Sequence, residues 1–337
     1  MKNINRKKAA YLLMFVGIAL LLIGIVTSVS LGAKDIDLST IVSSMLHDNN
    51  DINTKIIRDV RMPRAIAAAL VGGFLAVAGA IMQGITRNPI AEPSVMGITQ
   101  GATFMIAVAL VIQRMFPHLI ISSFAMMMFA FAGASISGLL VYFVSSRSMR
   151  KVDPVKLALA GTALGTLLIS LAMGISMYFN LSQQLTFWIS GGVTGAKWSS
   201  ITLLAIIGGG ALIGAILMAP KITILSLGEE IAIGLGQKTN KIRFISILLV
   251  ILLTGASVSV AGNIVFVGLI IPQIVRGIVG ADYKYIIPSS MVFGSVLLVY
   301  SDILARMINP PYETPIGSLT ALLGVPVFIY LVRKDTK

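Results

Sequence analysis

The sequence contains no cysteine, only two histidines and few charged residues. The absence of cysteine excludes a small scaffold held together by disulfides. The two histidines, His47 in a predicted outer loop and His118 near a predicted membrane edge, cannot assemble a metal cluster. Charged residues make up only 12% of the 337 residues, well below the roughly 25% that is typical of soluble proteins. This is too little charge to cover a water-facing surface of that size.

The sequence also lacks a phosphate-binding loop of the P-loop type. That motif needs a Gly followed directly by Lys and then by Ser or Thr. Here Gln237 separates Gly236 from Lys238, and the glycine-rich stretch 191–197 fails for the same reason. We therefore expect no nucleotide hydrolysis by this chain, so a partner or an ion gradient has to drive any uphill transport. We also expect no catalytic residue, no metal site and no cofactor bound by the chain itself.

Only one acidic residue is expected at membrane depth, where ionisable groups are costly and usually functional. Asp302 lies in a long apolar stretch, and Arg306 follows it by one helical turn. This i, i+4 spacing predicts a local ion pair. The alternative interpretation is a proton relay through Asp302, as in an ion-coupled secondary transporter.

Hydrophobic residues are what the sequence has in abundance, with 56% of the total and a mean hydropathy of +0.93. A helix needs roughly 20 apolar residues to cross a bilayer. The uncharged runs are Ala9–Ala33, Ala65–Thr86, Pro93–Gln113, Met115–Ser146, Leu157–Ala196, Trp198–Pro220, Phe244–Val275, Tyr285–Ser301 and Thr314–Val332. Phe244–Val275 has room for two spans that meet near Gly262. The polar second half of Leu157–Ala196 predicts a short helix or a re-entrant segment at the membrane surface.

These runs predict an all-α integral membrane protein with about ten transmembrane helices, plus short outer and cytosolic helices. We expect residues 1–337 to form a single transmembrane domain. With the N-terminus inside, the inner segments hold 18 of the 26 Lys and Arg residues, as the positive-inside rule demands. An even number of spans then places both termini in the cytoplasm.

Small residues recur at helical spacing in several of these runs. Gly72, Ala76, Ala80 and Gly84 fall every four residues, and the pairs Gly161/Gly165 and Gly210/Gly214 repeat that spacing. Small residues at this spacing let helix backbones approach closely inside lipid. The sequence therefore predicts closely packed helices at these positions.

The predicted outer face carries Arg58, Arg61 and Arg64 at three-residue spacing, together with Arg306. Basic residues on this side run against the positive-inside trend. The planar guanidinium suits the recognition of carboxylates, which predicts an acidic protein partner or an anionic ligand. Neutralisation by the nearby Asp51 and Asp59, or contact with lipid phosphate, is the alternative.

The predicted inner loop begins with Glu229 and Glu230, an acidic pair that favours the start of a short helix. Small residues then alternate with Ile and Leu up to Gly236. A partly apolar surface on the soluble side usually has a protein partner. The alternative is an ordinary connector that packs on its own helices.

A series of motifs runs along nearly the whole chain: Arg61–Arg64, Gly72–Gly84, Arg87–Ala102, Leu159–Gly165, Leu227–Glu229, Val267–Pro272, Asp302–Arg306, Pro315–Gly317 and Leu323–Tyr330. This series resembles the FecCD-type permease family of ABC importers for ferric siderophores, haem and cobalamin, and most of all the ferric-siderophore permease subunits. The resemblance implies a second permease subunit (a copy or a relative), two cytosolic ATPase subunits that use ATP and Mg²⁺, and an extracytoplasmic substrate-binding protein. It implies a ferric-siderophore substrate and a place among the lipids of the bacterial inner membrane, with no nucleic acid. Haem or cobalamin is the alternative substrate.

The resemblance also implies roles for particular residues. Docking of the binding protein falls to Arg61, Arg64 and Arg306, and coupling to the ATPase falls to Leu227, Gly228, Glu229, Glu230, Ala232, Gly234 and Gly236. The translocation pathway falls to Met173, Met177, Asn180, Leu181, Gln184 and Trp188, although core packing is the alternative for either methionine. Gln273 and Tyr283 stand where many relatives carry His, and the sequence offers no account of either change.

Overall fold

The computed structural model describes residues 2–32, 37, 43–44, 51–147, 151–152, 154–310 and 312–335. Within these ranges the protein is built from helices, together with one antiparallel pair of two-residue strands, β1 (Ser146–Arg147) and β2 (Lys151–Val152). The helices are α1 (Lys2–Ser30), α3 (Ile52–Lys55), η1 (Ile56–Arg61), α4 (Met62–Thr86), η2 (Pro93–Met96), α5 (Ile98–Met115), α6 (Ser123–Ser145), α7 (Pro154–Tyr178), α8 (Ser182–Ser190), α9 (Trp198–Leu203), η3 (Leu204–Gly208), α10 (Gly209–Leu227), α11 (Glu229–Gly234), α12 (Thr239–Ala261), α13 (Val267–Val279), α14 (Tyr283–Met307) and α15 (Ile316–Asp335).

Eight helical segments of the described chain are long and apolar enough to cross a membrane. Two shorter apolar helices, Val267–Val279 and Ile316–Ile329, join them. Together they correspond to the ten segments expected from the sequence, including the break of Phe244–Val275 into α12 and α13. The second half of Leu157–Ala196 contains the short helix α8. The prediction of an all-α membrane protein is confirmed.

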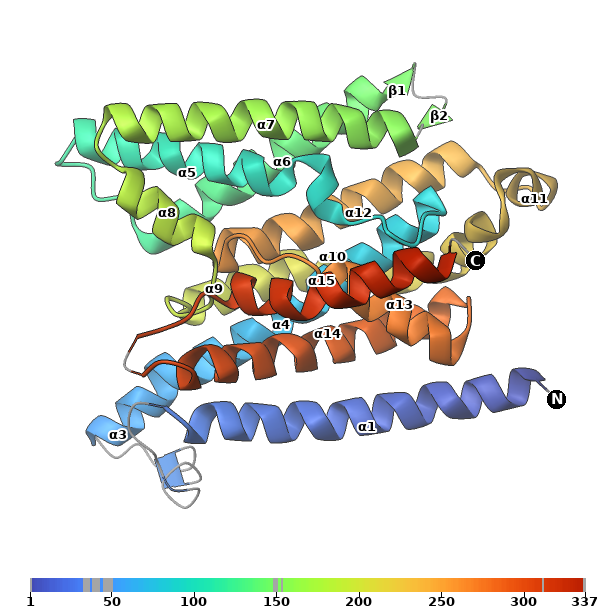
Figure 1. Cartoon of the computed structure of the whole chain (residues 1–337), viewed down its shortest axis with the longest axis horizontal. Helices are drawn as coiled ribbons and strands as arrows, with labels where there is room; N and C mark the ends of the chain where they lie inside the picture. The colour runs from blue at the N-terminus through green and yellow to red at the C-terminus, as the bar shows by residue number, and fades with distance from the viewer. Residues whose placement is uncertain are drawn as a thin grey trace.

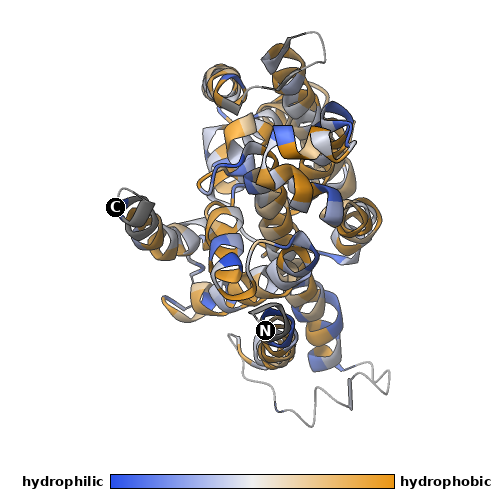
Figure 2. Ribbon diagram, turned by 90° about the vertical axis from the view of Figure 1, so that its right-hand side faces the viewer, coloured by the Kyte–Doolittle hydropathy of each residue, from blue (hydrophilic) through white to orange (hydrophobic). Residues whose placement is uncertain are grey.

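Helix α4 forms the centre of the bundle, and α14, α12, α13 and α10 pack around it. In the most apolar stretch of this helical segment, 89% of the residues are buried. Helices α1 and α7, by contrast, run along the outside (Figure 1). Hydrophobic residues prevail along the helix ribbons (Figure 2), and large apolar side chains of α1, α6 and α10 are exposed, which is typical of helices that contact lipid. Both termini lie at the end of the bundle that carries α11 (Figure 1); we call it the α11 end, and the opposite end, with Arg64, the arginine end.

Glycine allows α4 to touch its neighbours backbone to backbone. A Cβ added to Gly72 would lie 2.2 Å from the carbonyl oxygen of Gly294 in α14, and one added to Gly79 would lie 1.8 Å from that of Gly268 in α13. The close packing predicted for the small face of α4 is therefore present. The predicted Gly210/Gly214 pair differs, because no atom of another described element lies within 4 Å of a Cβ added to Gly210.

Two connections between helices of the bundle are irregular, the one between α12 and α13 and the one between α4 and α5. Helix α13 has 13 residues, about 20 Å at 1.5 Å per residue, so it is too short to cross the hydrocarbon core. Its first turn is preceded by Phe266 in a left-handed conformation, with a φ of 69°. The segment between α4 and α5 is also irregular, and it begins at Arg87 with a φ of 54°. Irregular backbone is tolerated at membrane depth where it is buried in protein.

Candidate functional site

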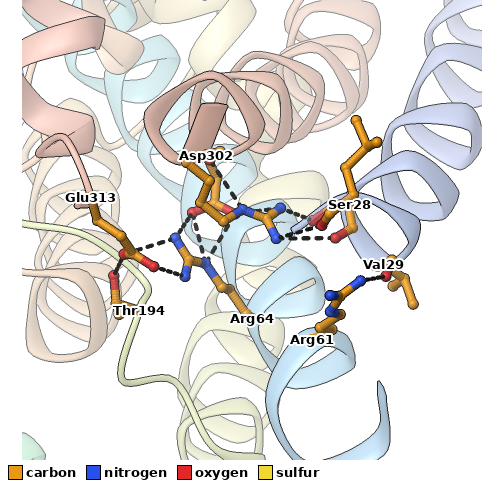
Figure 3. A network of polar contacts seen from close by, with 9 residues as sticks. Ser28, Val29, Arg61, Arg64, Thr194, Asp302 and Glu313 are labelled. Atoms are coloured by element: carbon orange, nitrogen blue, oxygen red, sulfur yellow. Dashed lines mark hydrogen bonds and ion pairs between the residues drawn. The ribbon is translucent and has the colours of Figure 1, made fainter. Parts of the chain in front are cut away.

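Arg64 is the centre of a polar network at the arginine end of the bundle (Figure 3). Its Nε lies 3.0 Å and its Nη2 lies 2.9 Å from Oδ1 of Asp302. Its Nη1 lies 2.6 Å from Oε1 of Glu313, in the segment before α15. The planar fork of the guanidinium therefore joins α4 to a carboxylate on α14 and to one on the following loop. Only 6% of Arg64 is exposed.

Asp302 is shared between two arginines. Besides Arg64, the Nη2 atom of Arg306 lies 3.2 Å from Oδ2 of Asp302, one helical turn away. The ion pair predicted from the i, i+4 spacing is confirmed. A buried carboxylate is stable only when it is paired and hydrogen-bonded, and Asp302, which is 1% exposed, meets that condition. Nowhere in the described ranges do three potential ligands from His, Cys, Asp and Glu gather into a metal site.

Arg61 and Arg306 bind the last carbonyl groups of α1. Nη1 of Arg61 lies 2.7 Å from the carbonyl oxygen of Val29 and 2.8 Å from that of Ser30. Nη1 of Arg306 donates to the carbonyl oxygens of Ser28 at 3.2 Å and Leu31 at 3.3 Å, and its Nη2 donates to Oγ of Ser28 at 2.8 Å. The last carbonyls of a helix have no partner within it and carry partial negative charge. Because the last turn of α1 contains no basic residue, arginines from η1 and α14 supply these donors.

The three arginines assigned to docking therefore bind groups within the chain. Arg61 and Arg64 are buried, and Arg306 is largely covered. The partners of Arg64 are Asp302 and Glu313 rather than the two acidic residues that are near in sequence. The guanidinium groups of Arg61 and Arg64 are not exposed, because their donors bind and fix the ends of α1, α4 and α14. Docking of a binding protein at this end stays a prediction.

Glu313 extends the network toward α8. Its carboxylate accepts hydrogen bonds from Arg64 and from Oγ1 of Thr194, a residue in the loop that follows α8. Partial burial alone would raise the pKa of Glu313, but these hydrogen bonds and the charge of Arg64 outweigh it and hold the pKa below its ordinary value. The place of Glu313 and Thr194 in this network was not predicted from the sequence, since no spacing rule links either residue to Arg64.

The pKa of Glu313 predicts a loss of stability in acid. A carboxyl whose pKa is lowered by folding stabilises the protein fully above its ordinary pKa, and that contribution is lost as the pH falls through the lowered value. Since the ordinary pKa is 4.5, the melting temperature of the detergent-solubilised protein is expected to fall below that pH, and less so in Glu313→Gln. Equal acid sensitivity of the two proteins would contradict this assignment.

A cavity of about 590 Å³ lies beside Arg64 and Glu313. Phe187 and Trp188 of α8 line it, together with residues at the nearby ends of α6, α12 and α15. Trp188 is therefore the one predicted pathway residue that borders this cavity. Its lining is mainly apolar, with Arg64, Lys197 and Glu313 as the charged members.

The remaining pathway residues lie on α7 and its junction with α8. Met173, Met177, Asn180 and Gln184 are all exposed on the chain, which makes core packing of the two methionines wrong. Leu181 is the exception. It is buried, and its backbone N–H donates to the carbonyl of Ser176, so its side chain does not belong to that surface.

The predicted coupling loop forms the separate short helix α11 between two glycines. Gly228 and Gly236 have φ values of 140° and 76°, conformations that suit glycine. Ala232 is fully buried, and Glu229 forms an ion pair of 3.1 Å with Arg243 of α12. These two contacts anchor the loop.

The other face of α11 is apolar and uncovered. Ile231 and Ile233 of α11, with Leu227 just before the helix and Leu235 just after it, are each at least half exposed. The loop lies at the same end of the bundle as both termini (Figure 1). An exposed apolar patch on a helix outside the bundle favours a protein partner over an ordinary connector.

Comparison with known proteins gives a consistent result. The family model of the FecCD transport family matches residues 20–334. The chain is 46% identical over 334 residues to the iron(3+)-hydroxamate import system permease protein FhuB of Bacillus subtilis, covering 99% of this chain and 86% of that protein. It is 39% identical to the Fe(3+)-citrate import system permease protein YfmD of the same organism, covering 98% and 97%.

A solved structure of a metal-chelate type ABC transporter in an inward-facing conformation has the same fold. It matches with a TM-score of 0.82 and 27% identity, over 95% of this chain and 98% of that one. The family predicted from the motifs is confirmed by the sequence comparisons and by the shared fold. The chain belongs to the FecCD transport family.

Proposed function

We propose that this chain is the membrane permease subunit of an ATP-driven importer of iron(III)–siderophore complexes, with ferric hydroxamates as the first class to test. The observation that carries the proposal is the similarity to an iron(3+)-hydroxamate permease over 99% of the chain. The exposed face along α7 and α8 supports a permease role, because it contains methionine and neutral polar residues without charge. A wide, weakly binding surface of this kind suits a bulky complex that must enter and leave.

The energy for transport comes from partner subunits. Two cytosolic ATPases, which bind ATP and Mg²⁺, dock on the apolar face of α11 in this proposal. Their closure moves α11, and the movement reaches the helices that line the pathway between two permease subunits. The exposed apolar surface of α11 and its anchoring through Glu229 and Ala232 support this arrangement.

A loaded substrate-binding protein docks at the arginine end in this proposal. Arg61, Arg64 and Arg306 contribute by fixing the ends of α1, α4 and α14, so that the surface offered to the binding protein has a defined shape. The α11 end then faces the cytoplasm together with both termini. This orientation agrees with the excess of Lys and Arg in the segments of that end.

The proposal predicts ATP-dependent uptake of hydroxamate-bound iron. Cells that lack their own siderophore permeases should accumulate radiolabelled iron from a ferric hydroxamate when they express this chain with its ATPase and its binding protein. Uptake should stop when the ATPase is replaced by a variant unable to hydrolyse ATP.

Other outcomes of the same assay identify the alternatives. Uptake of haem or cobalamin, with none of ferric hydroxamate or ferric citrate, would change the substrate. Uptake that survives the loss of the ATPase and collapses when the proton gradient is dissipated would favour an ion-coupled transporter.

A further inference from the structure

Glu92 caps a helix that lies far from it in the sequence. Its Oε1 accepts a hydrogen bond of 2.8 Å from the backbone N–H of Phe266, the residue that precedes α13. The N–H groups at the start of a helix have no partner within it, and their partial positive charge favours a carboxylate. Glu92 therefore joins the irregular segment between α4 and α5 to the N-terminal end of α13.

The same segment rests directly on α7. Helix η2 follows Glu92 without a gap, and a Cβ added to Gly161 of α7 would lie 1.9 Å from the carbonyl oxygen of Val95. Beyond η2, the carbonyl of Gly97 accepts a hydrogen bond of 2.8 Å from Ser137 of α6. Because the backbones of η2 and α7 are in direct contact, neither can shift toward the other without moving it. A displacement of Glu92 therefore reaches α7 through η2.

The other end of α13 is joined to the segment that leads into α11. Arg276, in the last turn of α13, donates to the hydroxyl of Tyr283 and lies 5.5 Å from the centre of its ring. The backbone N–H of Tyr283 donates to Oγ1 of Thr223 at 2.9 Å. Thr223 lies in the last turns of α10, just before α11. Tyr283 thereby links α13 and α14 to the last turns of α10, which lead into α11.

Gln273 adds a second link between α13 and the irregular segment. Its Nε2 donates to the carbonyl oxygen of Pro89 at 2.7 Å and to Oε1 of Gln83 at 3.2 Å. Gln83 in turn donates to the carbonyl of Leu269 at 3.1 Å. The two positions where this chain differs from many relatives, Gln273 and Tyr283, thus both hold α13 in place.

We propose that Glu92 is a positioning residue that joins α13 to η2, so that a movement of α11 passes through Thr223, Tyr283 and α13 to Gly161 on α7. This inference rests on the proposed function, because α7 carries the predicted pathway residues Met173 and Met177. Each step is a hydrogen bond, an ion–aromatic contact or a backbone contact between rigid helices. The hydrogen bond from Phe266 to Glu92 joins the loop before α13 to the segment between α4 and α5. Neither segment is α-helical, so the relay is most easily interrupted at this contact.

The test uses substitutions at both sides of η2. Glu92→Ala removes the acceptor for the N–H of Phe266, and Glu92→Gln keeps a side-chain oxygen there. Gly161→Ala forces η2 away from α7, whereas Gly210→Ala, with no atom within 4 Å of the new Cβ, is the matched control. The complete importer is reconstituted in vesicles, and the iron imported for each ATP hydrolysed is measured.

This ratio is expected to fall about tenfold in Glu92→Ala and in Gly161→Ala, which is within the usual range of coupling between sites. Glu92→Gln should recover most of the loss, and Gly210→Ala should behave as the unmodified protein. A purely structural defect would lower the amount of active complex and leave the ratio unchanged. Because both substitutions interrupt one relay, the double variant should be no worse than the poorer single variant, whereas independent effects would multiply.

A second measurement follows the relay itself. Since the sequence has no cysteine, spin labels can be placed at Leu167→Cys on α7 and Ile278→Cys on α13, which are both exposed positions. ATP should change the distance between the labels in the unmodified complex but not in Glu92→Ala.

An unchanged ratio in Glu92→Ala, multiplied losses in the double variant, or no effect of ATP on the distance in the unmodified complex would each overturn the inference. The label measurement needs no substrate. An importer that responds to ATP but carries no ferric siderophore would therefore refute the proposed substrate and still test the relay.

Discussion

Replacing Arg64 by Met is expected to destabilise the protein by about 3–5 kcal/mol, the usual cost of removing one partner of a buried ion pair. Asp302 would keep only Arg306, and Glu313 would keep only Thr194. The loss should appear as a lower melting temperature in detergent and a lower yield of folded protein. Changing Asp302 to Leu in the Arg64→Met variant should recover part of the stability, because it removes the buried charge left behind.

Arg114 provides the control for this prediction. It is an exposed arginine at the end of α5, so Arg114→Met should change the stability by less than about 0.5 kcal/mol. If Arg64→Met were as stable as Arg114→Met, the network of Figure 3 would not support the fold.

The buried position of Arg64 also changes how docking can be tested. Reversing Arg61 and Arg64 to Glu would place a third carboxylate beside Asp302 and Glu313 and would remove the donors bound to the end of α1. Uptake would then be lost whether or not these residues contact a binding protein. A conclusive test needs substitutions of exposed residues at the arginine end, with the folded amount measured in parallel.

Replacing Ile231 and Leu235 together by Asp is expected to abolish uptake and the co-purification of the ATPase. Both side chains lie on the uncovered face of α11, and 63% of Leu235 is exposed. If they fill pockets on the partner, each substitution should cost about 2 kcal/mol of binding or more. The folded amount of the permease should be unchanged, because neither side chain is part of its core.

The control for α11 lies at the other end of the molecule. Ile52 in α3 is 73% exposed, so Ile52→Asp places an aspartate at an exposed apolar position away from the predicted partner, with one of the two negative charges that the α11 variant carries. Co-purification of the ATPase with this variant should equal that of the unmodified protein. If the α11 variant also retained the ATPase and imported iron normally, α11 would not be the docking surface.

Local signals in the sequence predict most of the fold. The charge-free runs locate the ten apolar helices because charged side chains are costly in lipid. Gly262 marks the break between α12 and α13, and its φ of 64° explains why glycine stands there. The pair of Asp302 and Arg306 was predictable because its members lie one turn apart on one helix.

Other features depend on contacts that no local pattern encodes. Arg64 and Asp302 are 238 positions apart, and Arg64 and Glu313 are 249 apart, so only the folded bundle brings them together. Glu92 could be placed in a loop from the sequence, but its contact with Phe266 depends on where α13 begins. Leu181 was assigned to the pathway by the family resemblance, and its burial could not be predicted from the polar residues on either side of it.

The attachment of α1 has a consequence for biosynthesis. Helix α1 is made before either of these donors, yet its final carbonyls are bound by Arg61 and by Arg306, which lies 278 positions after Ser28. Both donors must have left the ribosome before these bonds can form. Helix α1 therefore reaches its final place only after α14 has been translated, and nascent chains that end before α14 should leave α1 loosely held.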